Sequence, residues 1–416
     1  MQVKVRRGLD VRYEGAPRQV IGQGPAIRTA AVLGADYPGL RPTFLVEVGS
    51  RVVAGEPLVR DRRNQDRVIV SPVSGRVEAI TRGAHRSLDT LVISDAGEDR
   101  LTFELPATLD RDQLVSLLMS SGSWAALLSR PFGRPADLGS IPEALFITAI
   151  DTRPLAADPR VVIEAHVEWF VRGASALRQL TADKVYLCHA VGAALPAIEG
   201  VEPVGFAGPH PAGLAGTHIH HLHPVGNNNT VWHIGYQDVI AIGHLLATGQ
   251  VWTDRIVALG GPAVSDPGLY RTRPGASLRE LAEGRLWSEA VHLYSGSILD
   301  GEVLEYLSRG QVQVSVVPHR AAREQPGGML QRLRRWVSAG VPAVIPNSMH
   351  ERVAPAGILP IPFLRAISIG DIDMARRLGA LELVEEDMAL LAHVDGSGTD
   401  FGAMLRAALD ELADVS

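Results

Sequence analysis

The sequence is poor in several residue types, and each shortage excludes a class of protein. Cys188 is the only cysteine among 416 residues, which excludes an internal disulfide and an iron–sulfur cluster held by four thiolates of this chain. Only Lys4 and Lys184 are lysines, and the Gly-Lys-Ser/Thr step of a phosphate-binding loop does not occur. Cys188 follows an apolar run, so we interpret it as a core residue rather than a nucleophile.

Aromatic residues and long apolar runs are also scarce. Aromatic side chains make up 5 % of the chain, so its cores must consist mainly of aliphatic side chains. No apolar run approaches the roughly 20 residues of a membrane helix. The start of the sequence has no apolar signal core, so we expect no direct membrane span and a cytoplasmic location. A net charge of −6 argues against a nucleic-acid binder, because such proteins carry basic surfaces.

Short β-strands separated by Gly and Pro fill the first hundred residues. Val48–Leu58 reads VGxxVxxGxxL, and Ser71–Val77 reads SPVSGxV. This frame resembles the hammerhead fold of biotinyl and lipoyl domains and predicts such a β domain over residues 1–104. In carrier domains the hairpin between the two halves presents a lysine for the cofactor. Here the hairpin, Arg60–Asp66, has no lysine, so we expect the fold without the cofactor.

From residue 105 onward, strands alternate with helices. Ala144–Ile150 and Lys184–Ala190 are continuous apolar runs, as buried parallel strands are. Pro159–Leu180 and Tyr236–Ala247 instead have apolar residues at helical spacing. This alternation predicts a Rossmann-like α/β domain over residues 105–254.

Residues 255–416 are predicted to form two further domains. A strand from Arg255, the segment Pro274–Leu281 and two later apolar strands predict a β-grasp domain over residues 255–325, with a small sheet around one short helix. Residues 326–416 have a helical pattern and are expected to form a helical C-terminal bundle. The helices expected there are Met329–Val337, Asp371–Leu378, Glu385–Leu391 and Asp400–Leu412, the last three beginning at acidic residues that suit helix starts. The predicted fold class is therefore a multidomain α/β protein.

Histidines are the unusual feature of the sequence. Six of the 14 lie between His189 and His223, four of them in the run from His218 to His223. On a strand, His218 and His220 would share one face, while the other two would lie on the opposite face. Because this alternation divides the set and no carboxylate stands within the run, we expect no metal site. A structural or interface role and a proton-handling role near a quinone both remain open.

Other candidate sites are weak. No GxGxxG loop occurs, so dinucleotide binding by the usual turn is disfavoured. The acidic cluster Glu385-Glu386-Asp387 is interpreted as helix-start and surface charge. No nucleophile with an oriented base is recognisable. Residue patterns alone therefore predict a soluble multidomain α/β protein without an evident active site.

Several long segments carry a family resemblance. They are GLDVRYEGAP with GPAIRTAAVLGADYPGLRP, GLAGTHIHHLHPVG with TVWHIGYQDVIAIGHLLATG, RTRPGASLRELAEG, SGSILDG and GDIDMARRLGALELVEEDMALL. In this order they cover most of the chain and resemble the A subunit of the bacterial sodium-translocating NADH:quinone oxidoreductases. That family is similar to the flavin-binding subunit of respiratory complex I. The sequence departs from the family at Val394–Thr399, where a Cys-Pro-Gly-Lys step is usual, and at Ala380, where cysteine is common.

The resemblance implies a subunit of a pump that moves electrons from NADH to quinone and exports Na⁺. It implies a chain with no catalytic centre and no cofactor of its own, peripheral on the cytoplasmic side of the inner membrane. Its partners would be the other pump subunits, which hold the flavins and iron centres, and among them the membrane-bound B subunit. Contact with ubiquinone is left open, with His218 and His220 as the candidate residues. The alternative is a free-standing small-ligand-binding protein built from the same modules.

Overall fold

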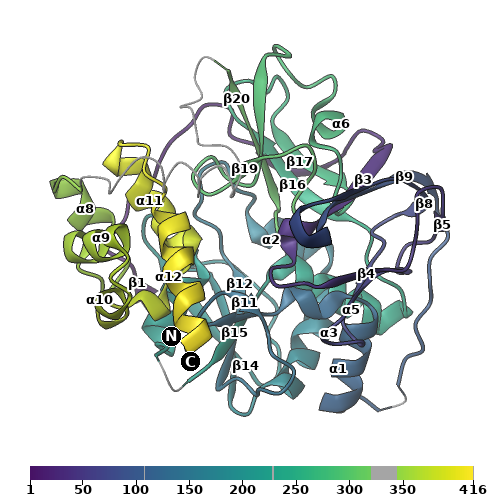
Figure 1. The fold of residues 1–416 in the computed structure, drawn as a ribbon, viewed down its shortest axis with the longest axis horizontal. Helices are drawn as coiled ribbons and strands as arrows, with labels where there is room; N and C mark the ends of the chain where they lie inside the picture. Colours follow the sequence, from purple (N-terminus) through teal and green to yellow (C-terminus); the bar gives the residue numbers. More distant parts are fainter. Residues whose placement is uncertain (107, 227–228, 320–343, 416) are drawn as a thin grey trace.

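The computed structural model describes residues 1–106, 108–226, 229–319 and 344–415. These residues form four units around a common centre (Figure 1). An α/β unit lies at the bottom, a mixed-sheet unit at the top, a β-rich barrel unit on the right and a helical unit on the left. The predicted mixed α/β fold and helical C-terminal region are confirmed, and the expected helix Met329–Val337 lies outside the described residues.

The barrel unit is built from two small sheets that enclose an aliphatic core. One sheet has the order β3-β9-β8-β5 and the other β4-β6-β7. The loop that contains no lysine, where a carrier domain would attach its cofactor, joins β6 to β7. The strands are β3 (Thr29–Leu33), β4 (Pro42–Phe44), β5 (Arg51–Val52), β6 (Pro57–Asp61), β7 (Val68–Val70), β8 (Ser74–Arg82) and β9 (Leu88–Gly97).

The α/β unit contains a seven-stranded sheet with the order β1-β14-β13-β12-β15-β10-β11. The two apolar runs of the sequence form β12 and β13, which pair in parallel with Ala144 opposite Lys184. The strands are β1 (Gln2–Lys4), β10 (Leu128–Arg130), β11 (Arg134–Pro135), β12 (Ala144–Ala149), β13 (Lys184–Ala190), β14 (Val201–Ala207) and β15 (Val231–Gly235). The helices are α1 (Arg111–Ser120), α2 (Pro159–Ala165), α3 (Val167–Leu177), α4 (Ala215–Leu222) and α5 (Tyr236–Thr248).

Two glycines let α3 and α5 cross at close range. A Cβ atom on Gly243 would lie 1.7 Å from the carbonyl oxygen of Trp169, and one on Gly173 would lie 2.1 Å from that of Val239. Both distances are far below van der Waals contact, so the crossing requires glycine at each position. Helix α5 packs on β12 and β15, and both helices contribute side chains to the main hydrophobic core.

The mixed-sheet unit has six strands in the order β19-β18-β20-β16-β17-β2 and one short helix. Its elements are β2 (Arg18–Gln23), β16 (Arg255–Gly260), β17 (Gly268–Thr272), α6 (Leu278–Ala282), β18 (Val291–Ser295), β19 (Glu302–Val303) and β20 (Gln313–Pro318). Ser277 begins α6 by accepting a hydrogen bond from the backbone N–H of Glu280.

The first two strands of the chain lie away from the barrel unit. Strand β1 pairs in parallel with β14 of the α/β unit, and β2 pairs in parallel with β17 of the mixed-sheet unit. Local sequence pattern does not reveal these partners, because each lies about 200 residues or more further along the chain. Residues predicted to belong to the first domain thus supply edge strands to two others.

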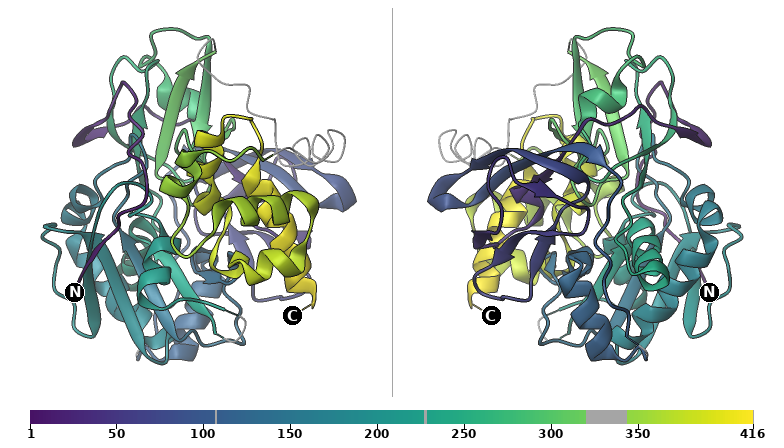
Figure 2. Two further views of the ribbon diagram at one scale, coloured as in Figure 1. Left: turned by 90° about the vertical axis from the view of Figure 1, so that its left-hand side faces the viewer. Right: turned by 90° about the vertical axis from the view of Figure 1, so that its right-hand side faces the viewer.

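The helical unit packs against the side of the molecule that faces the viewer in the left panel of Figure 2. Asp371 accepts a hydrogen bond from the N–H of Met374, and Asp400 accepts one from the N–H of Ala403, as expected of residues at helix starts. Within the described part of the chain, no helix is long and apolar enough to cross a membrane. The helices are α8 (Ser348–Val353), α9 (Pro360–Ile369), α10 (Ile372–Arg377), α11 (Glu385–Asp395) and α12 (Phe401–Val415).

Candidate functional site

The histidine run lies on helix α4, so the prediction of a strand was wrong. Local hydrogen bonds favour the helix, because the His221 ring bonds through Nδ1 to the carbonyl oxygen of Thr217, one turn earlier. Residues two apart on a helix differ by about 200° in direction. His218 and His220 therefore point to different surroundings instead of sharing a face.

His218 points into the α/β unit. Its ring is fully buried, lies 4.3 Å from the ring of Phe206 between centroids, and bonds through Nε2 to the carbonyl oxygen of Ala212 at 3.0 Å. Its Nδ1 has no hydrogen-bond partner among the described residues. Burial lowers the pKa of His218 to about 3, because the charged ring would lose its hydration. The ring is therefore neutral at physiological pH.

His220 points toward the helical unit. Its Nδ1 lies 2.6 Å from a carboxylate oxygen of Glu382, just before α11. The hydrogen bond to Glu382 raises the pKa of His220, and burial opposes this in part. The ring also lies against the backbone of Gly357. His220 thus forms an ion pair between two units and is about half-buried.

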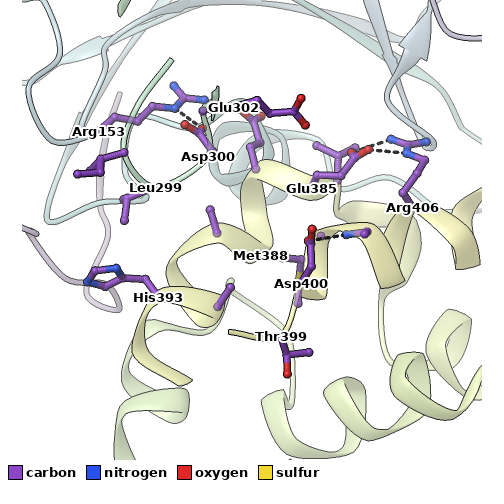
Figure 3. A pocket seen from close by; sticks show the side chains of 18 of the residues that line it. Arg153, Leu299, Asp300, Glu302, Glu385, Met388, His393, Thr399, Asp400 and Arg406 are labelled. Atoms are coloured by element: carbon purple, nitrogen blue, oxygen red, sulfur yellow. Dashed lines mark hydrogen bonds and ion pairs between the residues drawn. The ribbon is translucent and has the colours of Figure 1, made fainter. Parts of the chain in front are cut away.

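A cavity of about 750 Å³ lies where the α/β, mixed-sheet and helical units meet. Arg153 and His233 come from the α/β unit, the segment 298–302 from the mixed-sheet unit, and most of the remaining wall from α11 and the start of α12. Figure 3 shows Arg153 and Asp300 on one side of the cavity and Met388, on α11, on another. Neither His218 nor His220 lines this cavity.

Buried ion pairs hold the three units together beside the cavity. Arg153 lies 2.6 Å from Asp300, 2.5 Å from Glu386 and 3.4 Å from Asp151. Arg130, whose side chain is fully buried, pairs with Glu386 at 3.2 Å and with Asp387 at 3.0 Å. The interpretation of Glu386 and Asp387 as surface charges was therefore wrong, since both approach a buried guanidinium.

Burial dominates the ionisation of these groups. It raises the pKa of Glu386, an effect that Arg153 and Arg130 reduce and Asp387 strengthens. Burial also raises the pKa of Asp151, against the attraction of Arg153. Burial opposes the charge of Arg153, but the surrounding carboxylates, Asp300 first, hold its pKa well above the ordinary value. The guanidinium therefore stays charged and holds the carboxylates together.

Cys188 and the possible metal ligands of the described residues can be judged from their surroundings. Burial raises the pKa of Cys188 well above its usual value, so its thiol is an inert core group, as predicted. In the part of the chain that the structure describes, no three His, Cys, Asp or Glu side chains gather as metal ligands would. The ion pairs of Arg153 and Arg130 instead join the α/β, mixed-sheet and helical units to one another.

Sequence reasoning missed Arg153 and Asp300. They are separated by 147 residues, and Arg153 and Glu386 by 233. The one local signal was the position of Asp151 and Arg153 directly after the apolar run that forms β12, since polar groups at the carboxyl end of a parallel strand commonly face a ligand crevice.

Three family models match the chain in order. They describe the NqrA N-terminal barrel-sandwich hybrid domain over residues 3–96, the NqrA second alpha/beta domain over 109–251 and the NQRA C-terminal domain over 256–305. These matches define the class, a multidomain chain of the NqrA type.

Full-length relatives specify the family. The chain is 42 % identical to the A subunit of the Na(+)-translocating NADH-quinone reductase of Pseudomonas aeruginosa strain UCBPP-PA14, over 99 % of both chains. It is 41 % identical to the protein of the same name from Yersinia pestis bv. Antiqua, with the same coverage. A solved chain of an NAD⁺-reducing [NiFe]-hydrogenase is 16 % identical with a TM-score of 0.39, covering 74 % of this chain and 62 % of that one, a likeness too low to support any argument. The chain belongs to the family formed by the A subunits of Na(+)-translocating NADH-quinone reductases.

Proposed function

We propose that this chain is a subunit of a Na⁺-translocating NADH:quinone reductase and acts within that complex rather than alone. The observation that carries the proposal is 42 % identity spread over 99 % of the chain and of its relative. The match extends over the full length of both chains, as expected if the two proteins do the same work in the complex.

Docking is the main role that we assign to the chain. We infer that, at the cytoplasmic face of the inner membrane, it sits on the membrane-bound B subunit. Co-expression with the B subunit from the same organism should bring the chain into the membrane fraction, whereas expression alone should leave it in the supernatant. If the chain remains in the supernatant with the partner present, the docking proposal fails.

The chain is proposed to hold no redox group. Its single cysteine and the absence of lysine from the β6–β7 loop support this proposal. The purified chain should be colourless, and its intact mass after expression beside a biotin or lipoyl ligase should equal that of the bare chain. A flavin absorbance band, stoichiometric iron or zinc that survives a chelator, or a mass adduct would contradict this.

Finer domain assignments accompany this proposal. The two small sheets at residues 29–97 support a hammerhead of the biotinyl and lipoyl type. The parallel strands with helices between them support a Rossmann-like second domain, and the mixed sheet with its single helix α6 supports a β-grasp third domain.

Quinone contact at His218 and His220 can be tested in the assembled complex. The partners of the two rings, a backbone carbonyl for His218 and Glu382 for His220, support structural roles. We therefore expect His218→Ala and His220→Ala to impair assembly or to have no effect. A selective loss of quinone reduction, with NADH oxidation by an artificial acceptor retained, would instead assign the histidines to the quinone.

A further inference from the structure

Two histidine rings lie side by side on the mixed-sheet unit, where β18 pairs with β20, the strand at the top of Figure 1. His292 lies opposite Val317 in this antiparallel pair. His319, two residues beyond Val317, therefore projects from the same face of the sheet. Its backbone N–H donates to the carbonyl oxygen of Ala290 at 3.0 Å, which continues the strand pairing past the end of β20. The two ring centroids are 4.4 Å apart, with 49° between the ring planes.

The imidazole nitrogens of this pair are not used by the fold. Val291 and Leu293, on either side of His292, belong to the core of the mixed-sheet unit, whereas His292 is partly exposed and His319 is exposed. Within the described part of the chain, the nitrogens of these two rings form no hydrogen bond or ion pair. Each ring therefore keeps a nitrogen lone pair that can bind a ligand from solvent.

The pair is unfavourable when protonated and suited to an ion that both rings can share. Burial lowers the pKa of His292, and the neighbouring His319 lowers it further. His292 is therefore neutral at pH 7, which is the form of histidine that binds metals. Two protonated rings at this distance would repel each other, whereas one metal ion can accept a lone pair from each.

The separation of the rings fits one metal ion bound by both. With metal–nitrogen bonds of about 2.0 Å, two imidazole centroids lie about 4.5 Å apart when the bonds meet at a right angle, and about 5.2 Å apart at a tetrahedral angle. The separation of 4.4 Å is close to the first value. Right-angled bonds are typical of Cu²⁺ and Ni²⁺, whereas Zn²⁺ prefers a tetrahedron. Because His319 is exposed, its ring can turn to direct a nitrogen at the ion.

We propose that His292 and His319 form a two-histidine site for a divalent transition-metal ion, with Cu²⁺ preferred and water in the remaining positions. Among first-row divalent ions, Cu²⁺ binds nitrogen ligands most tightly, and Mg²⁺ prefers oxygen ligands. Two side chains hold an ion less firmly than the three or four of a structural site, so a strong chelator should remove it. The proposal concerns the surface of the mixed-sheet unit and is independent of the proposed role in the pump.

A second pair of histidine rings provides a comparison. The centroids of His220 and His221 on α4 are 5.3 Å apart, but Nδ1 of His220 is bonded to Glu382 and Nδ1 of His221 to the carbonyl oxygen of Thr217. These bonds hold the two rings in place and leave one nitrogen on each. We therefore expect this pair to bind an ion more weakly than His292 and His319.

The test uses the full chain without a histidine tag, freed of metal by a chelator and then titrated with Cu²⁺ at pH 7.5 in a calorimeter. We expect one tight site for Cu²⁺, binding of Ni²⁺ and Zn²⁺ at least about tenfold weaker, and no binding of Mg²⁺. Electron paramagnetic resonance at half an equivalent of Cu²⁺ should show coupling to two imidazole nitrogens. Coupling to a single imidazole in the unaltered chain would overturn the proposal.

Three variants locate the site. His292→Gln and His319→Gln should each weaken Cu²⁺ at least about tenfold and leave one coupled imidazole, and the double variant should bind about as weakly as either one, because the gain requires both rings. His221→Gln is the matched control and should bind as the unaltered chain does. If the first two variants bind Cu²⁺ as tightly as the unaltered chain, or if His221→Gln causes the loss, the proposal is wrong. The control decides this even if a variant in β18 fails to fold.

Discussion

His218 and His220 stand two residues apart and have opposite electrostatic environments. His218 lies against Phe206 in the core, where a charged ring would lose its hydration without gaining a counter-ion. His220 has the Glu382 carboxylate at 2.6 Å. The same side chain is therefore held neutral at one position and favoured in its charged form at the other.

The two rings should titrate separately. Because burial lowers the pKa of His218 to about 3, its ring should remain neutral at pH 5, with the proton on Nε2 facing the Ala212 carbonyl. His220, whose pKa is raised, should already be largely protonated at pH 6. Long-range ¹H–¹⁵N spectra of the chain labelled at histidine, assigned through His218→Gln and His220→Gln, would measure the protonation of both rings as a function of pH. A His218 ring that titrates near 6.5 would contradict the buried placement.

The His220 ion pair should stabilise the fold at low pH. A raised folded-state pKa gives a contribution that is complete below the unfolded-state value of about 6.5 and disappears as the pH rises through the folded-state value. His220→Gln should therefore lower the free energy of unfolding by about 0.5–1 kcal/mol at pH 6 and by less at pH 9. Urea unfolding at the two pH values measures this.

His223 provides the matched control for that measurement. It pairs with Glu143 at 2.8 Å, but the Glu143 side chain is 53 % exposed. Solvent weakens such a pair, so His223→Gln should change the free energy of unfolding little at either pH. An equal loss for His220→Gln at pH 6 and pH 9 would mean that packing, and not charge, accounts for the effect.

At the scale of elements, the crossing of α3 and α5 depends on the missing side chain of Gly243. An added Cβ would lie 1.7 Å from a backbone oxygen, which cannot move without shifting α3. Gly243→Ala should therefore destabilise the chain by about 2–4 kcal/mol, although alanine is the better helix former by about 1 kcal/mol. Thermal and urea unfolding would measure the loss.

Gly310→Ala serves as the comparison for Gly243. Gly310 has no heavy atom within 4 Å of the added Cβ and does not have a positive φ. The same substitution there should leave stability unchanged or raise it by up to about 1 kcal/mol, because it restricts the unfolded chain. If both variants lost stability equally, the close crossing would not be the cause.

Sequence patterns predicted elements best where burial is uniform. Ala144–Ile150 and Lys184–Ala190 are apolar throughout, and both form strands of the central sheet. The histidine run misled the prediction because alternation of polar and apolar residues over a short segment also fits one exposed and one buried side of a helix. Pro159–Leu180 has helical spacing, but the chain leaves the helix at His166, where φ is −138°, and forms two helices instead of one.

At the scale of the whole molecule, Arg130 is central to attachment of the helical unit. Its fully buried side chain holds two carboxylates of α11, and removing one partner of a buried ion pair leaves the others uncompensated. Arg130→Ala should therefore lower the free energy of unfolding by about 3–5 kcal/mol. Hydrogen exchange should increase first in α11 and α12, while β12 and β13 stay protected. Uniform loss of protection over the chain would contradict separate detachment of the helical unit.

Arg134→Ala is the control for Arg130→Ala. Arg134 also reaches the helical unit, through Asp410 at 3.0 Å, but both side chains are about half exposed. Surface ion pairs contribute at most about 1 kcal/mol, so exchange in α11 should change little.

The candidate site was less predictable than the fold, for a physical reason. Strands and helices leave a local periodicity, whereas the site consists of charges brought together from three units. The residues that flank Asp300 and Glu386 in the sequence do not indicate that both carboxylates approach Arg153. The acidic start of α11 was recognised, but its burial depends on Arg130, more than 250 residues earlier.

The placement of β1 and β2 limits how the chain can be cut into fragments that fold. It also limits the order in which its sheets can be completed. Residues 2–4 finish the edge of one sheet beside β14, and residues 18–23 finish the edge of another beside β17. On the ribosome, these two strands emerge long before their partners and must wait for them. A fragment cut at the apparent boundaries of the α/β unit or the mixed-sheet unit would expose an unpaired strand edge, the usual starting point of aggregation. Expression of either unit by itself therefore calls for a supplied copy of the missing strand.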